Sequence, residues 1–122
     1  MQAQFHYENL SWQRSIAFHL QENSFLKNRL AEVVDSKADR DFLAWAEHFQ
    51  NQFIIKDEYM EELRHDVHEQ ERRLAGKGPA SPSDTEAAVV IRQRHLRDQL
   101  DYLEKDFANL RREFHLYLAE RL

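Results

Sequence analysis

The chain has 122 residues, of which 42% are hydrophobic and 32% are charged, and its formal net charge is −5 at pH 7. This balance excludes a disordered polymer, which would be less apolar, and a membrane-embedded protein, which would be less charged. The length suits one small domain, and the acidic charge argues against a protein that mainly grips nucleic acid. The absence of cysteine excludes disulfides, thiolate metal sites and cysteine nucleophiles.

Glycine and proline are confined to one short stretch, at Gly76, Gly78, Pro79 and Pro82. A β-rich fold of this length needs many turns, and turns favour these two residue types. The composition therefore indicates long helices, and it argues against glycine-rich phosphate loops and catalytic elbows.

The first predicted helix covers about residues 4–34. Its apolar residues recur three and four positions apart, as one helix face requires, at Phe5, Trp12, Ile16, Leu26, Leu30 and Val33. Polar residues interrupt this stripe at Asn9, His19 and Asn23. The sequence leaves open whether residues 1–10 belong to the helix.

A break is predicted at residues 35–39, because the apolar stripes on its two sides do not join in phase. Ser36, followed three residues later by Asp39, is the predicted N-cap of a second helix over about residues 37–75. A continuous helix through the break is the alternative. The second stripe contains Phe42, Ala46, Phe49, Phe53, Lys56, Met60, Leu63, Val67, Gln70 and Leu74.

The second break is a predicted loop over residues 76–82, where Gly76 can end a helix in the left-handed conformation and Pro79 cannot continue one. The third helix, over about residues 83–120, can begin with Ser83 and Glu86 as a capping box, or with Ser81 as the cap and Pro82 in the first turn. Its stripe contains Val89, Gln93, Leu96, Leu100, Leu103, Phe107, Leu110, Phe114 and Tyr117.

Stripes with a seven-residue period over four or more repeats indicate helices that coil gently around one another. Short connections make successive helices antiparallel. The prediction is an all-α fold, a single domain over residues 1–122 that forms an up-down-up three-helix bundle about 50 Å long. Such a rod has a large surface for its volume, which favours burial against a second copy in a homodimer.

Some apolar residues lie outside the stripes. Phe18 and Phe25 are one heptad apart on the first helix, and Ile54 and Ile55 lie on the second. A fold about residue 36 places Phe18 opposite roughly residue 55. These four residues are the predicted protein-contact patch, since a contiguous apolar patch usually marks a contact. The alternatives are harmless scattered exposure and an N-terminal segment that folds over these residues.

His19, Asn23 and Lys56 form a predicted polar layer near the middle of the core. Such a layer can fix the register of helices at a cost in stability, and the Lys56 ammonium could reach outward to Asp101 or Glu104. The alternative is a small ligand or an ion bound at this layer.

The sequence gives little support for a metal site or a catalytic site. His65 and His68 lie three residues apart on the second helix and could chelate a stray divalent ion at the surface, but they face away from the core. The serines fit cap, turn or helix-surface positions, and no carboxylate has the apolar setting that raises its pKa. We therefore expect no native metal, no cofactor and no enzymatic activity.

Residues 47–55 (EHFQNQFII) and 62–66 (ELRHD) resemble a family of short bacterial proteins. The resemblance covers about a third of the chain, and it implies a small bacterial helical protein without assigning an activity. The N-terminus lacks the basic start and apolar run of a secretion signal, so a cytoplasmic location is expected. The overall expectation is a helical bundle that contacts itself or another protein, and neither nucleic acid nor a membrane.

Overall fold

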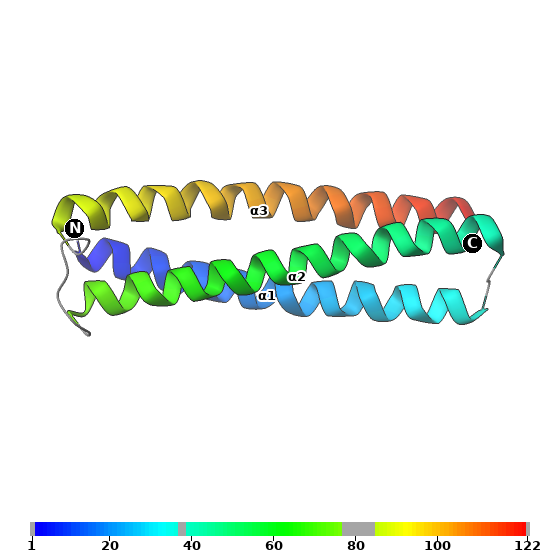
Figure 1. Cartoon of the computed structure of the whole chain (residues 1–122), viewed down its shortest axis with the longest axis horizontal. Coiled ribbons are helices and arrows are strands. Elements are labelled where there is room, and N and C mark those ends of the chain that lie inside the picture. The colour runs from blue at the N-terminus through cyan, green and yellow to red at the C-terminus, as the bar shows by residue number, and fades with distance from the viewer. Residues whose placement is uncertain (1, 37–38, 77–84, 122) are drawn as a thin grey trace.

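The computed structural model consists of three long helices, α1 (Gln2–Ser36), α2 (Arg40–Leu74) and α3 (Glu86–Arg121). The structure describes residues 2–36, 39–76 and 85–121, and it contains no strand within them. The helices form an antiparallel up-down-up bundle, which confirms the predicted fold class (Figure 1). The start of α1 and the end of α3 lie at opposite ends of the rod (Figure 1). The predicted helix limits differ from the observed ones by at most three residues.

The break between α1 and α2 is real, but Ser36 is not the cap. The Asp39 side chain accepts a hydrogen bond from the Phe42 backbone N–H at 2.7 Å, and Asp39 has the extended backbone of an N-cap residue. Ser36 is the last residue of α1, and its hydroxyl donates to the Val33 carbonyl at 3.1 Å. The predicted Ser36 cap is therefore wrong, because the Asp39 side chain satisfies a free N–H group in the first turn of α2.

The end of α2 agrees with the prediction from Gly76, which has a φ of +69°. The N–H of Gly76 donates to the Arg73 carbonyl at 3.1 Å, which closes the last turn. Both predicted caps of the third helix, Ser81 and Ser83, lie outside the described residues. Within the described part, the hydroxyl of Thr85 accepts from the N–H of Ala88 at 3.2 Å and caps the first turn of α3.

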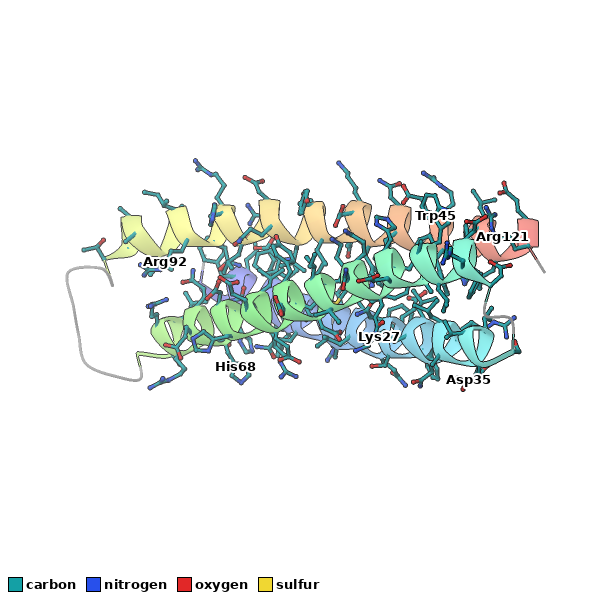
Figure 2. All side chains as sticks on the ribbon, turned by 45° about the vertical axis from the view of Figure 1, so that its right-hand side comes forward. Lys27, Asp35, Trp45, His68, Arg92 and Arg121 are labelled. Carbon is teal, nitrogen blue, oxygen red and sulfur yellow. The ribbon has the colours of Figure 1, made fainter. Side chains whose placement is uncertain are left out.

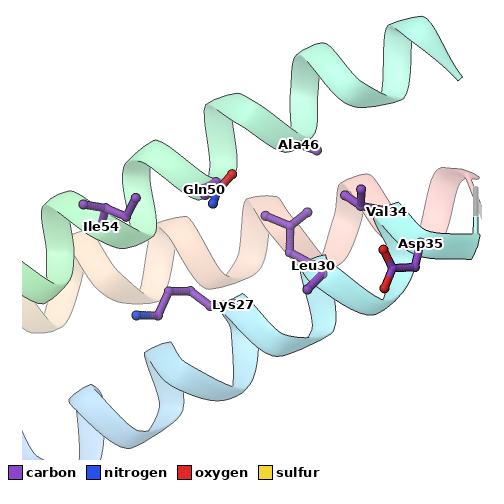
Figure 3. A pocket seen from close by; sticks show the side chains of 8 residues that line it. Lys27, Leu30, Val34, Asp35, Ala46, Gln50 and Ile54 are labelled. Carbon is purple, nitrogen blue, oxygen red and sulfur yellow. The ribbon is translucent and has the colours of Figure 1, made fainter. Parts of the chain in front are cut away.

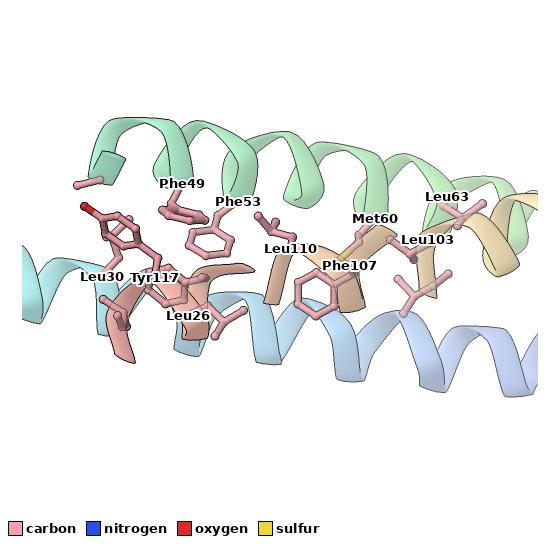
Figure 4. Close-up of a cluster of buried hydrophobic side chains, with 14 of the residues drawn as sticks. Leu26, Leu30, Phe49, Phe53, Met60, Leu63, Leu103, Phe107, Leu110 and Tyr117 are labelled. Carbon is pink, nitrogen blue, oxygen red and sulfur yellow. The ribbon is translucent and has the colours of Figure 1, made fainter. Parts of the chain in front are cut away.

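The three stripes meet along the axis of the bundle, and polar and charged side chains cover its outside (Figure 2). Phe53 and Phe107, labelled in Figure 4, are among the largest fully buried side chains, and so is Phe114. The rings of Phe53 and Phe114 meet edge to face, with their centroids 5.2 Å apart. Backbone contact is most extensive between α1 and α2 and least between α1 and α3. No described helix has the length and apolarity needed to cross a membrane.

Candidate functional site

Of the predicted central layer, Asn23 is fully buried, whereas His19 and Lys56 are partly buried. The Asn23 side chain is fully buried, and its amide donates to the Phe53 carbonyl at 2.9 Å and to the Asp57 carboxylate at 2.7 Å. Lys27, one turn further along α1, binds the other oxygen of Asp57. Asn23 and Lys27 therefore tie α1 to α2 at this level.

Lys56 binds a different carboxylate from the two that were predicted. Its ammonium lies 2.5 Å from the Asp106 carboxylate, and its side chain is only 12% exposed. The prediction of Asp101 or Glu104 is wrong because it assumed a fold at residue 79. The observed pair corresponds to a register of α3 against α2 that differs from the predicted register by about one helical turn.

His19 is half-buried on α1, and its ring centroid is 5.4 Å from that of Phe107 on α3. Burial lowers the pKa of His19 below its usual value of 6.5, although the nearby carboxylates of Glu104 and Glu22 act in the opposite direction. Its Nδ1 atom is buried and has no hydrogen-bond partner in the described part of the chain. His19 therefore favours the neutral form in the folded protein.

A second polar layer lies near the end of the bundle that holds the start of α1. It consists of Asn9, Gln70 and Gln93, one from each helix, and all three side chains are fully buried. The Gln93 amide donates to the Asn9 side-chain oxygen at 2.8 Å, and the Gln70 amide donates to the Gln93 side-chain oxygen at 3.1 Å. We call this set the end layer. It was visible in the sequence as separate interruptions of three stripes, but not as one group.

Charged residues close the end layer at its edges. Arg97 holds Glu8 through two hydrogen bonds of 2.7 and 2.8 Å, and the Gln93 amide also donates to Glu8. Burial raises the pKa of Glu8, but the hydrogen bonds from Arg97 and Gln93 outweigh it and bring the pKa below its usual value. On the α2 side, Glu71 accepts from the Asn9 amide at 3.0 Å and contacts His6 at 2.7 Å. The end layer is thus joined to ionic groups on both sides.

A ladder of three polar pairs joins the parallel helices α1 and α3. The pairs are Glu8 with Arg97, Ser15 with Glu104, and Glu22 with Arg111, at 2.7, 3.1 and 2.5 Å. Each pair follows the previous one by seven residues on both helices, so the ladder repeats once per heptad. It lies at the interface with the fewest close backbone contacts, and it sets the register of α3 against α1.

The four residues of the predicted contact patch are all exposed. The exposed fractions are 60% for Phe18, 64% for Phe25, 42% for Ile54 and 49% for Ile55. They do not share one surface, however. Ser15 and Glu22 contact α3, and each lies three residues before one of the phenylalanines. Because side chains three residues apart are neighbours on a helix, Phe18 and Phe25 lie beside the α1–α3 interface.

The two isoleucines lie next to other interfaces. Ile54 lines a hollow between α1 and α2. Tyr59, four residues after Ile55, donates a hydrogen bond from its hydroxyl to the Gln99 carbonyl of α3 at 3.4 Å. Side chains four residues apart are neighbours on a helix, so Ile55 lies beside the α2–α3 interface. The four residues of the predicted patch thus lie beside different interfaces, because an equal level along the rod does not mean an equal direction around it.

The hollow beside Ile54 has a volume of about 280 Å³ and is mostly apolar (Figure 3). It forms where Ala46 stands in a stripe whose neighbouring members are phenylalanines. Leu30 and Val34 of α1 line its other wall. The volume is below the range of about 300–1,000 Å³ that is typical of small-molecule sites. We therefore attribute the hollow to the small side chain of Ala46.

The surface pair His65 and His68 has no complete set of metal ligands. The neighbouring carboxylates of Glu61 and Glu69 bind Arg64 and Arg72, and His68 lies 3.3 Å from the Gln13 amide. Among the described residues, no group of three or more histidine or carboxylate side chains is arranged to hold a metal ion.

Comparisons of this chain with known proteins add nothing to these observations. The resemblance of residues 47–55 and 62–66 to short bacterial helical proteins stays a prediction. Protein-family models, curated proteins and solved structures yield no match to this chain.

Proposed function

We propose that the chain is a non-enzymatic helical bundle that acts by protein–protein contact, with itself or with another protein, through the outward surface of α1. One observation carries the proposal. Phe18 and Phe25 are 60% and 64% exposed and one heptad apart, whereas nearly all of the apolar stripe of the same helix is buried. Two large aromatic side chains at this spacing are the usual anchors of a helix-mediated contact.

The interior supports a contact role rather than a catalytic one. Lys56 is paired with Asp106, and Glu8 is paired with Arg97. These buried or half-buried charges hold helices together, and their ionic partners leave them poorly suited to move a proton on a substrate. The expected cytoplasmic location and the resemblance to short bacterial proteins add no catalytic role.

The test compares two double variants of equal chemistry. Phe18→Glu/Phe25→Glu changes the proposed surface, and Ile54→Glu/Ile55→Glu changes exposed apolar residues of α2. Both should keep the helical circular dichroism of the wild type, because the four side chains are exposed. Association, measured by light scattering on the pure protein and by affinity capture from cells, should be lost only in the phenylalanine variant. Equal behaviour of the two variants would refute the proposed surface.

A second candidate function is the binding of a small ligand or an ion at the central layer. Three buried atoms within one turn of α1 favour it, because His19 Nδ1, Glu22 Oε2 and Asn23 Oδ1 have no hydrogen-bond partner in the described part of the chain. A ligand that donates to these atoms should raise the melting temperature of the wild type and not that of His19→Leu. No shift with divalent cations or small amines would remove this candidate.

A further inference from the structure

The side chains of the end layer belong to one continuous chain of hydrogen bonds that crosses all three helices. Arg92 Nε donates to the Gln70 side-chain oxygen at 3.3 Å, and the Gln70 amide donates to the Gln93 oxygen at 3.1 Å. The Gln93 amide donates to the Asn9 oxygen at 2.8 Å, and the Asn9 amide donates to Glu71 at 3.0 Å. We call this series the amide chain. Each of its links joins two different helices, so no helix holds its part of the chain alone.

The donors of the amide chain all point the same way, from a cation to a carboxylate. A guanidinium can only donate and an ionised carboxylate can only accept, whereas a side-chain amide can do both. Arg92 at one end and Glu71 at the other therefore determine the direction of the amides between them. A side contact agrees with this direction, because the Gln93 amide also donates to Glu8 at 2.8 Å.

The three amides of the chain lie where water does not replace a lost partner. Asn9, Gln70 and Gln93 are each 0% exposed. A buried amide that loses its partner costs more free energy than the hydrogen bond itself contributes, and hydrogen bonds in a buried chain strengthen one another. If the end of one helix separates, it therefore leaves polar groups of the other two helices without partners.

We propose that the amide chain couples Glu71 on α2 to Arg92 on α3, and that it makes the start of α1, the end of α2 and the start of α3 open together. These three helix ends lie at the same end of the rod (Figure 1). Helix ends ordinarily fray separately, because each gives up only its own contacts. Here the loss of any one helix end breaks links to both others, so joint opening, which lets water reach all three amides, costs less.

Both ends of the amide chain reach the surface. At one end, Glu71 also contacts His6, which is exposed, at 2.7 Å. At the other end, Arg92 lines a groove of about 310 Å³ between α2 and α3. A group that draws Arg92 away from Gln70 in this groove would weaken the hold on the start of α1. Neither Phe18 nor Phe25 belongs to the chain, so the coupling does not depend on the proposed contact surface.

A double-mutant cycle between the two ends of the chain measures the coupling. Glu71→Gln and Arg92→Leu should each raise the equilibrium constant of unfolding about tenfold, because each weakens a hydrogen bond to a charged group. Since each end depends on the other, the double variant should fall about threefold or more short of the product of the two single effects. Urea unfolding followed by circular dichroism gives all of these values.

Two comparisons separate the chain from other effects. Glu61→Gln makes the same chemical change on the same helix, but Glu61 binds Arg64 of its own helix, so its combination with Arg92→Leu should show no shortfall. In a Gln93→Leu background, the shortfall between Glu71→Gln and Arg92→Leu should vanish, because Gln93 carries the middle of the chain. A shortfall that persists in that background would come from direct attraction between opposite charges, and it would overturn the proposal.

Hydrogen exchange of the backbone amides tests the joint opening in the wild type, without any variant. In low concentrations of urea, the backbone amides of Asn9, Gln70 and Gln93 should share one free energy of opening and one dependence on urea. A lower value at Asn9 alone would show that α1 frays by itself, and it would overturn the proposal. A shared value without the shortfall in the double-mutant cycle would assign the joint opening to apolar packing, and it would equally overturn the role of the amide chain.

Discussion

At the scale of single residues, the end layer shows how a helical bundle can bury polar groups without leaving them unpaired. Gln93 uses both its amide hydrogens and its oxygen, through Glu8, Asn9 and Gln70. Gln70 also donates to the Val89 carbonyl at 2.9 Å. Because each partner depends on the others, removing one member should cost more than removing the whole layer.

Gln93→Leu should lower the free energy of unfolding by about 1–3 kcal/mol, because it leaves the Asn9 oxygen and a Gln70 hydrogen buried without partners. Replacing Asn9, Gln70 and Gln93 together by leucine should cost less than the single change or even stabilise the fold. Urea unfolding followed by circular dichroism measures both values. A triple variant with a lower free energy of unfolding than Gln93→Leu would contradict this reasoning.

His19 gives the stability a dependence on pH. Because burial lowers its pKa in the folded state, the unfolded chain binds the proton more readily. The stability associated with neutral His19 is therefore fully present above the unfolded value of 6.5, and it is lost as the pH falls through the lower folded value.

His19→Leu should accordingly melt at the same temperature as the wild type or higher at neutral pH, and it should lose less stability on acidification. Melting curves at about pH 7.5 and about pH 5 test this. His95→Leu, which removes an exposed histidine of α3, is the control and should keep the wild-type difference between the two conditions. A large loss of stability in His19→Leu would show that the histidine contributes more than tolerated polarity.

At the scale of the helices, the caps decide where the chain bends. Asp39 accepts a hydrogen bond from the N–H of Phe42, so it holds the first turn of α2, while Ser36 completes α1. Two residues that both satisfy the sequence rule for a cap thus have different tasks. Unfolding measurements can separate the two roles, because both side chains are exposed and their replacement by alanine is a small change.

Asp39→Ala should reduce the free energy of unfolding by about 0.5–2 kcal/mol, the usual cost of losing an N-cap. Ser36→Ala should change it much less, because its hydroxyl donates to a carbonyl of the last turn that water can also satisfy. Thermal and urea unfolding of the two variants provide the comparison. Equal losses would mean that the first turn of α2 does not depend on Asp39.

The helices could be predicted from the sequence because burial follows the stripe. Phe42 to Val67 on α2 and Leu96 to Tyr117 on α3 are buried at nearly every position that the three-four spacing selects. The partner of Lys56 could not be predicted, since a shift of one turn in the α2–α3 register replaces Asp101 and Glu104 by Asp106. Periodicity determines which face of a helix is buried, but the register also depends on the connecting segment.

The contact surface was predicted only in part for a related reason. Exposure of Phe18 and Phe25 follows from their position off the stripe. Their separation from Ile54 and Ile55 depends on which helix packs against each side of α1 and α2. The position of a residue along the helix axis does not give this information. The end layer could not be predicted from the periodicity of single helices, because the meeting of Asn9, Gln70 and Gln93 depends on the register between the helices.

At the scale of the whole molecule, the bundle is a rod, because each helix has 35 or 36 residues and spans about 50 Å. Small-angle scattering should therefore give a pair-distance distribution with a long tail that reaches about 50–60 Å. Self-association of two rods side by side should double the scattering mass while the maximum dimension grows only slightly. An end-to-end dimer would instead nearly double the length.

The opposite placement of the start of α1 and the end of α3 has a mechanical consequence (Figure 1). Tension applied between these two ends pulls along the helix axes and drives α1 and α3 past α2 in opposite directions. Every heptad of the interfaces then carries load at the same moment, including the ladder of Glu8, Ser15 and Glu22 with α3. A hairpin pulled from one end instead separates one turn after another, so this odd-numbered bundle should yield at higher force than a two-helix hairpin of equal length.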